Sequence, residues 1–316
     1  MRAKNLLKSL PLLGINLVIF YYLIVWCSEN IRLDLFSRQF SQIPLKAVAL
    51  TIILNLTATA FYALRLGVMI NLRFQVSLPA IFLGFGLNTV LPFRLGEIAK
   101  LYYAKRYFRI PATSLFSATL VEKLFDLSAL AVLATLFVTL TSIVVIPTSI
   151  FIALIVVVII GFTAVLGYRK FAHRLERSMG ASARVQALIA ALHVQSQLNH
   201  LRRIVCYTLV IWALNIMVVY AGLSTFLPDY PIGVLDAIAL LLILAVAIAI
   251  PTAPAGIGLF EAGIVAYLSH VREVPNELAL AAAVVLHIAM MLPHLVAVSW
   301  IMIRQRPVPG DEVIHR

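Results

Sequence analysis

The sequence predicts an all-α polytopic integral membrane protein. Of its 316 residues, 62% are hydrophobic and 12% are charged, a composition that excludes a soluble globular protein. Long apolar stretches alternate with short basic segments, and two of the apolar stretches are interrupted by proline and glycine. We therefore expect about six full spans and two re-entrant helical hairpins, with eight full spans as the alternative.

The full spans are predicted from length, because a helix needs about 20 mainly apolar residues to cross the hydrocarbon core. Six stretches meet this requirement and lie near residues 10–28, 47–70, 112–142, 146–168, 204–224 and 276–303. The first follows a basic amino terminus, as a signal peptide does, but carries no small-residue cleavage site. We expect it to remain as an uncleaved span.

The two hairpins are predicted from interrupted apolar stretches. The stretch 78–108 is broken at "LPFRLG", and its arms of about 13 residues would rise only about 20 Å, short of a core of roughly 30 Å. The stretch 233–270 is broken within "IPTAPAGIGLFEAG". Its first arm is long enough to span, which keeps the eight-span alternative open.

The distribution of lysine and arginine predicts the orientation. With a cytoplasmic amino terminus, only Arg32, Arg38, Lys46 and Arg272 lie outside and Lys123 lies within a span, while the other twenty bases lie inside. This asymmetry agrees with the positive-inside rule and accounts for the net charge of +12. We expect both termini in the cytoplasm and no nucleic-acid partner.

The longest loop, 169–203, is rich in bases and carries apolar residues near helical spacing. Two interpretations remain open. The loop is either a solvated cytoplasmic segment whose charges set the topology, or an interfacial helix attracted to anionic lipid.

An internal repeat is visible in the spacing of landmarks around the two hairpins. Glu97 is followed by proline after fourteen residues and by Lys123 after twelve more, and Glu261 is followed in the same way by proline and His287. The predicted halves are 1–142, with the hairpin 78–108, and 146–303, with the hairpin 233–270. Three crossings separate the hairpins, so the copies face opposite sides, as in many transporters. The alternative is that proline and glycine simply recur at helix ends.

Ionisable residues within the apolar stretches are the candidate functional residues, because burying a charge in a membrane is costly. The substrate-binding or translocation candidates are Arg94, Glu97, Glu122, Lys123, Asp126, Glu261 and His287. The hairpin and hinge candidates are Pro92, Gly96, Pro254, Gly256 and Gly258. Glu122 and Asp126 share a helix face and need Lys123, another protein partner or a proton to offset their repulsion. Glu97 and Glu261 are interpretable either as structural groups, namely helix caps or ion-pair partners for Arg94 and Lys123, or as substrate contacts, and the two interpretations carry equal weight.

No motif for an enzyme is found. The sequence contains no G-x-x-x-x-G-K-[ST] loop, no H-E-x-x-H and no C-x-x-C. The two cysteines fall in separate apolar segments, which indicates neither a disulfide nor a thiolate metal site. We expect no catalytic residue, no metal and no cofactor.

Three segments together resemble a known family. "GFGLNTVLPFRLGEIAKLYYAKR", "ATLVEKLFDLSAL" and "IPTAPAGIGLFEAG" are similar to successive signatures of the flippase-like membrane region of lysylphosphatidylglycerol synthases, which also occurs as a stand-alone protein. The resemblance implies translocation of a phospholipid or an isoprenoid-linked envelope lipid, in a bacterial inner membrane. Phe93 stands where the family usually has glycine, and Lys123 where it usually has arginine. The chain ends at Arg316 without the synthase's aminoacyl-transfer domain, so lysyl transfer is not expected.

Three functions are compatible with these residues. The first is flipping of an anionic, aminoacylated or isoprenoid-linked lipid, with Arg94 and Lys123 receiving a phosphate. The second is a membrane-embedded transferase, or an accessory subunit that presents lipid to a separate transferase. The third is an ion-coupled transporter of a small anion, which an inverted repeat also suits.

Overall fold

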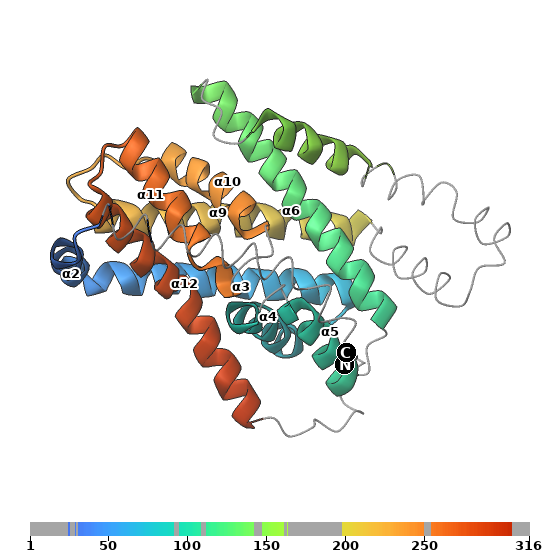
Figure 1. The fold of residues 1–316 in the computed structure, drawn as a ribbon. Helices are drawn as coiled ribbons and strands as arrows, with labels where there is room; N and C mark the ends of the chain where they lie inside the picture. The colour runs from blue at the N-terminus through green and yellow to red at the C-terminus, as the bar shows by residue number, and fades with distance from the viewer. Residues whose placement is uncertain are drawn as a thin grey trace, which may run out of the picture. The chain divides into compact units, whose positions relative to one another are not determined.

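The computed structural model describes residues 25, 29, 31–91, 95–108, 112–141, 147–160, 163, 198–249 and 254–304. All regular structure within these ranges is helical, which confirms the predicted fold class (Figure 1). The labelled elements are α2 (Leu33–Gln42), α3 (Leu45–Ile70), α4 (Phe74–Val90), α5 (Leu95–Phe108), α6 (Ala112–Thr141), α9 (Leu198–Phe226), α10 (Val234–Ala249), η2 (Pro254–Gly256), α11 (Leu259–Val271) and α12 (Asn276–Arg304).

Four of the described helices are long and apolar enough to cross a membrane, namely α3, α6, α9 and α12. They correspond to four of the six predicted spans, although α9 begins earlier than predicted, at Leu198. The predicted span 10–28 lies outside the described residues except for residue 25. Of the stretch 146–168, the described part contains a shorter apolar helix, Thr148–Ile160.

The chain divides into two compact units. One contains Met1–Leu56, Phe85–Gly96 and Asn215–Ala297, and the other contains Thr57–Gly84, Glu97–Leu214 and Val298–Arg316. Each unit takes segments from several long helices, so neither is a continuous half of the chain. The predicted repeat halves, 1–142 and 146–303, stay a prediction. The basic loop 169–203 lies outside the described residues, apart from the first residues of α9.

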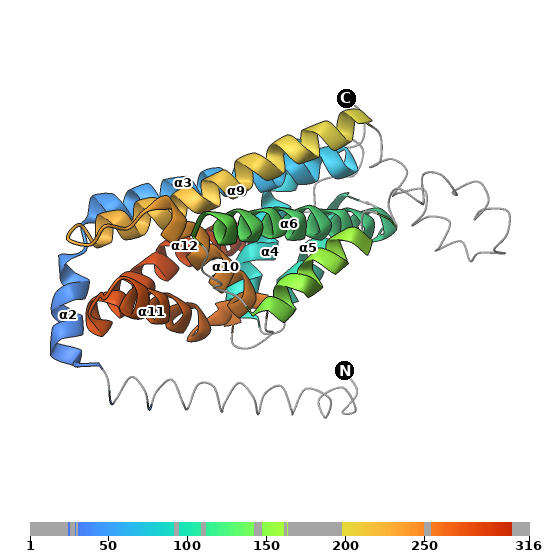
Figure 2. The same ribbon diagram turned by 90° about the horizontal axis from the view of Figure 1, so that it is seen from above.

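In the first unit, α10 and α11 form the second predicted hairpin (Figures 1 and 2). The buried Asp236 carboxylate, in the first turn of α10, accepts hydrogen bonds from the Tyr267 hydroxyl, at 2.7 Å, and from the Arg272 guanidinium, at 2.7 Å for both Nε and Nη2. Because Tyr267 and Arg272 lie at the end of α11, the two helices run antiparallel. Their lengths of 16 and 13 residues correspond to about 24 and 20 Å, which is short of a full crossing.

The first predicted hairpin corresponds to α4 and α5. Both are shorter than the four candidate spans, with 17 and 14 residues. Asn88, near the end of α4, accepts a hydrogen bond through Oδ1 from the Gly96 amide at the start of α5, at 2.8 Å. This bond joins the two sides of the break. Pro92 and Arg94, which the sequence predicts at the tip, lie outside the described residues.

The short helix α2 is amphipathic, and the span and hairpin analysis of the sequence did not predict it. Leu33, Phe36 and Phe40 follow an i, i+3, i+7 spacing that places them on one face, while Arg38 lies off that face. Leu33 and Phe40 are exposed. The helix runs across the direction of α3 in two perpendicular views (Figures 1 and 2). A helix with this pattern beside a membrane span is typical of the lipid–water interface.

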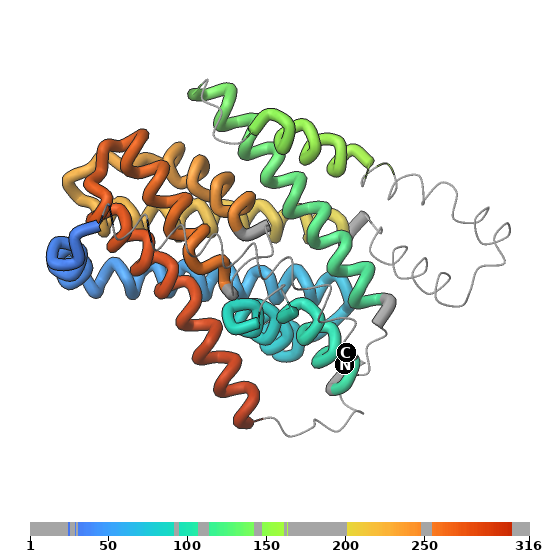
Figure 3. The backbone as a smooth tube through the Cα atoms, in the orientation of Figure 1, coloured from blue at the N-terminus to red at the C-terminus, as the bar shows by residue number. Residues whose placement is uncertain are grey.

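Helix α12 continues through a proline, and its backbone is traced as one coil (Figure 3). Pro293 has no amide hydrogen, so the carbonyl four residues earlier, at Ala289, loses its helical donor. At the next residue, the Met290 carbonyl accepts hydrogen bonds from two side chains, Asn55 Nδ2 of α3 at 2.9 Å and His294 Nδ1 at 2.8 Å. Polar side chains therefore support the backbone next to the proline, as is common in membrane helices.

Candidate functional site

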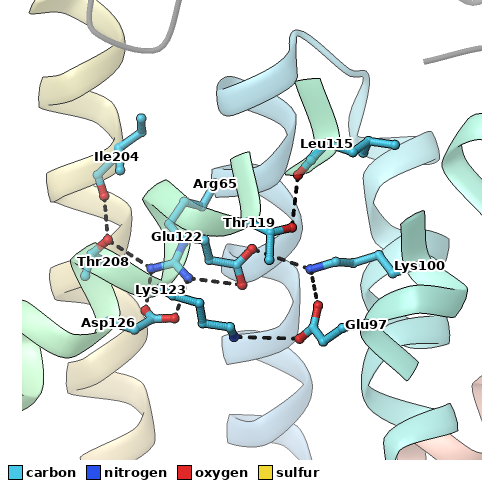
Figure 4. A network of polar contacts seen from close by, with 10 residues as sticks. All are labelled: Arg65, Glu97, Lys100, Leu115, Thr119, Glu122, Lys123, Asp126, Ile204 and Thr208. Carbon is cyan, nitrogen blue, oxygen red and sulfur yellow. Dashed lines mark hydrogen bonds and ion pairs between the residues drawn. The ribbon is translucent and has the colours of Figure 1, made fainter. Parts of the chain in front are cut away.

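The candidate site in the second unit is a network of three bases and three carboxylates (Figure 4). Its members come from four helices: Arg65 of α3, Glu97 and Lys100 of α5, Glu122, Lys123 and Asp126 of α6, with the hydroxyl of Thr208 from α9. With all six ionisable groups charged, the network is electrically neutral. This balance matters because an unpaired charge in a low-dielectric interior is expensive.

Arg65 anchors one side of the network. Its Nη1 and Nη2 donate to Asp126 Oδ1 and Oδ2 at 2.7 and 3.1 Å, a bidentate arrangement, and Nη1 also donates to Thr208 Oγ1 at 3.1 Å. Thr208 in turn donates to the Ile204 carbonyl at 2.8 Å. The Arg65 side chain is 1% exposed and its guanidinium lies over the Tyr62 ring. A planar guanidinium suits this role because it forms several hydrogen bonds in fixed directions.

Glu122 occupies the centre of the network, between Arg65 and Lys100 (Figure 4). Its oxygens lie 3.5 Å from Arg65 Nη2 and 3.5 Å from Lys100 Nζ. Lys100 also forms the shorter ion pair with Glu97 Oε2, at 2.8 Å. Glu122 and Lys100 are 3% and 2% exposed. These buried groups connect α3, α5 and α6, and Arg65 is the protein partner that offsets the repulsion predicted between Glu122 and Asp126.

Lys123 is the base at the open edge of the network. Its side chain is 43% exposed, whereas those of Arg65 and Lys100 are 1% and 2% exposed. Its ammonium contacts Glu97 Oε1 at 3.6 Å, a longer distance than that between Lys100 and Glu97. Lys123 and the partly exposed Glu97 thus present a loosely paired cation and an anion at the edge of a buried scaffold.

A second acid–base pair lies in the first unit, at the tip of the α10/α11 hairpin. Glu261 Oε1, in the first turn of α11, lies 2.6 Å from His287 Nδ1 of α12. The Phe260 ring stacks on His287 with centroids 4.0 Å apart. Glu261 Oε2 accepts a hydrogen bond from the Gly258 amide at 2.7 Å, so this carboxylate also caps its own helix. Glu261 therefore acts as a helix cap, and its side-chain partner is His287.

The turn before α11 explains the predicted glycines. Gly256 and Gly258 have φ angles of 76° and 91°, and Ala255 between Pro254 and Gly256 has φ 57°. Positive φ costs a residue with a Cβ roughly 1–2 kcal/mol, whereas glycine adopts it freely. These glycines let the backbone reverse so that Glu261 enters the first turn of α11.

The structure brings Glu97, Glu122, Lys123 and Asp126 together in one network and pairs Glu261 with His287. Arg94 lies outside the described residues. Sequence analysis missed Arg65 and Lys100, which it counted among the bases that set the topology. Removing these two leaves eighteen bases inside against four outside, so the predicted asymmetry persists. Arg65 does carry a signal, since it is a charge within the apolar helix α3, whose other charged residue, Lys46, is the second residue of the helix.

Comparison with protein families identifies the membrane region. The family model described as "Lysylphosphatidylglycerol synthase TM region" matches residues 13–297. The chain belongs to this family. The match covers every residue of the network and of the Glu261–His287 pair, and it confirms the resemblance found in the three sequence motifs. A lysylphosphatidylglycerol synthase membrane region indicates a role connected with membrane lipid. Comparison with curated proteins gave no match.

Proposed function

We propose that this protein moves a phosphate-bearing membrane lipid between the two leaflets of the bilayer. Lys123 receives the headgroup phosphate, and the buried part of the network holds Lys123 and Glu97 in position. The acyl or prenyl chains remain in the surrounding lipid. The observation that carries the proposal is the loosely paired, 43% exposed Lys123 ammonium beside a neutral, buried scaffold.

Lys123 suits reversible binding because its present contact is weak. An ammonium at 3.6 Å from a carboxylate oxygen is beyond a normal hydrogen-bond distance, which is about 2.7–3.2 Å. A lipid phosphate that approaches to hydrogen-bond distance would therefore replace a poor contact with a better one. Glu97 keeps its shorter contact with Lys100 throughout, at 2.8 Å in the structure, so the scaffold survives the exchange.

Glu97 gives the same site a way to recognise a positive substituent. One of its oxygens pairs with Lys100, and the other faces Lys123. When a phosphate draws Lys123 away, this second oxygen can accept a hydrogen bond from a headgroup amine. The arrangement is therefore compatible with both anionic and aminoacylated phospholipids.

A reconstituted system tests the proposal. Purified protein is placed in liposomes that contain fluorescently labelled phosphatidylglycerol, and a membrane-impermeant reductant reports how fast the label changes leaflet. Lys123→Ala should slow this movement at least tenfold, since a hydrogen bond to a charged group contributes about 1.5–3 kcal/mol. Lys123→Arg should stay within a few-fold of the original rate, because guanidinium also binds phosphate.

Lys105→Ala is the matched control, since Lys105 is an exposed lysine of α5 outside the network. It should leave the rate unchanged. The proposal fails if the wild-type protein moves neither labelled phospholipid nor a labelled isoprenoid lipid faster than protein-free vesicles.

The same preparation separates the two alternatives. A membrane-embedded transferase, or an accessory subunit of one, would produce a new lipid that mass spectrometry detects only when the chain is present. A small-anion transporter would take up labelled inorganic phosphate into lipid vesicles. For the cellular setting we propose a bacterial inner membrane with both termini in the cytoplasm, which protease accessibility in oriented vesicles would test.

A further inference from the structure

The two acid–base pairs share one sequence interval but differ in chemistry. Glu97 and Lys123 are separated by 26 residues, and so are Glu261 and His287. In each pair the acid lies in the first turn of a hairpin's second arm and the base lies in the following long helix. Lysine keeps its charge at physiological pH, whereas histidine changes its charge between about pH 5 and 8. The second pair therefore contains a type of side chain that can exchange a proton near neutral pH, and the first pair does not.

The hydrogen bonds assign the protons of the second pair. Glu261 Oε2 accepts the Gly258 amide, which favours the ionised carboxylate, so Oε1 accepts a hydrogen bond from His287 Nδ1–H. A second proton on the imidazole is then carried by Nε2. Within the described residues, no hydrogen-bond partner of His287 Nε2 is found. Without that proton the pair has a charge of −1, and with it the pair is neutral, like Glu97 and Lys123.

The titratable groups around the pair, within the described residues, are engaged elsewhere, so the charge change is assigned to His287. From α11 the titratable group that faces the imidazole is Glu261, and Phe260 stacks on the ring. On α12 the next titratable group is His294, which donates to the Met290 carbonyl and meets Phe85 edge-on. The side chain that α3 contributes near this part of α12 is the neutral Asn55. On α10, Asp236 is engaged with Tyr267 and Arg272 at the other end of the hairpin.

We propose that Glu261 and His287 form a proton-binding site that couples lipid movement to proton uptake. A proton from water joins His287 Nε2, the pair becomes neutral, and the second hairpin then accepts an anionic headgroup. After the headgroup leaves, the same nitrogen returns the proton to water. In the unprotonated state the net negative charge repels the phosphate. This inference rests on the proposed lipid movement and adds the ion that accompanies it.

The pH dependence of the wild-type rate is the first test. With equal pH on both sides, movement of labelled phosphatidylglycerol should slow as pH rises between roughly pH 5 and 8, the range over which histidine side chains generally change their charge. A pH-sensitive dye trapped in the vesicles should report proton uptake that accompanies the lipid.

Two variants assign the effect to His287. H287K gives the second pair the same permanent charge as the first, so its rate should change less than about twofold between roughly pH 5.5 and 8.5. H287Q, which is neutral and similar in size, should be slow and equally independent of pH. The control H294Q removes the neighbouring histidine of the same helix and should keep the wild-type pH dependence.

The two proposals fail in distinguishable ways. Wild-type protein that moves no lipid at any pH overturns the proposed function and this inference with it. Wild-type protein that moves lipid at a rate independent of pH overturns the coupling alone, as does a pH dependence that H287K and H287Q both retain. Loss of the pH dependence in H294Q would assign the proton to His294 and overturn the assignment to Glu261 and His287.

Discussion

Replacing Arg65 with methionine tests whether the buried network is held together by charge balance. Arg65 contacts Asp126 at 2.7 and 3.1 Å and Glu122 at 3.5 Å. Methionine fills a similar volume but leaves both carboxylates one cation short. Removing one partner of a buried ion pair costs about 3–5 kcal/mol. At about 2–4 °C per kcal/mol, the melting temperature should fall by roughly 10 °C.

The double variant Arg65→Met, Asp126→Leu is the informative comparison, because it removes one base and one acid. Lys100 and Lys123 then balance Glu97 and Glu122. We expect the double variant to recover at least half of the stability lost in Arg65→Met, corresponding to a coupling of about 1–3 kcal/mol in a double-mutant cycle.

The measurement is the fraction of protein that remains monodisperse after heating in detergent, followed by size-exclusion chromatography. Arg38→Met, an exposed arginine of α2, is the control and should change the stability by no more than about 0.5 kcal/mol. The reasoning is refuted if Arg65→Met has the same melting temperature as the wild-type protein. It is also refuted if the stability lost in the double variant equals the sum of the losses in Arg65→Met and Asp126→Leu.

Two further predictions use the same heating assay, and a third uses amide exchange in nanodiscs. Asp236→Asn should destabilise the protein by about 2–3 kcal/mol, since it removes the charge that holds the partly exposed Arg272; an unchanged melting temperature would contradict this role. Gly258→Ala should cost about 1–2 kcal/mol because φ is 91° there, whereas Gly233→Ala, with its nearest neighbour 3.6 Å from the added Cβ, should be tolerated. Phe40→Ser should weaken the binding of α2 to the lipid surface by about 2 kcal/mol. This loss would be measured as faster amide exchange of α2 in nanodiscs. Slow exchange in both forms would exclude the interfacial position.

The long helices were predictable because a membrane imposes a simple length rule. The predicted spans 47–70, 112–142 and 276–303 match Leu45–Ile70, Ala112–Thr141 and Asn276–Arg304 closely. Helix α2 was missed for the opposite reason. Its ten residues are too few for a span, and its one base, Arg38, was interpreted only as a marker of orientation.

The site was predictable only in part. Glu122, Lys123 and Asp126 stood out as charges within a long apolar helix. Arg65 and Lys100 were treated as ordinary topological charges, because bases are expected near the cytoplasmic ends of spans. Their pairing with Glu122 joins residues from α3, α5 and α6. No local spacing encodes such a contact, so it required the fold.

The proline in α12 makes the backbone of one helix depend on a side chain of another. The Met290 carbonyl accepts a hydrogen bond from Asn55 of α3, next to the turn that Pro293 deprives of a donor. A change at Asn55 would therefore be felt as faster amide exchange in α12 rather than in α3. The middle of α12 is in this sense a shared element, whose local unfolding free energy is partly set by a residue more than 200 positions earlier in the sequence.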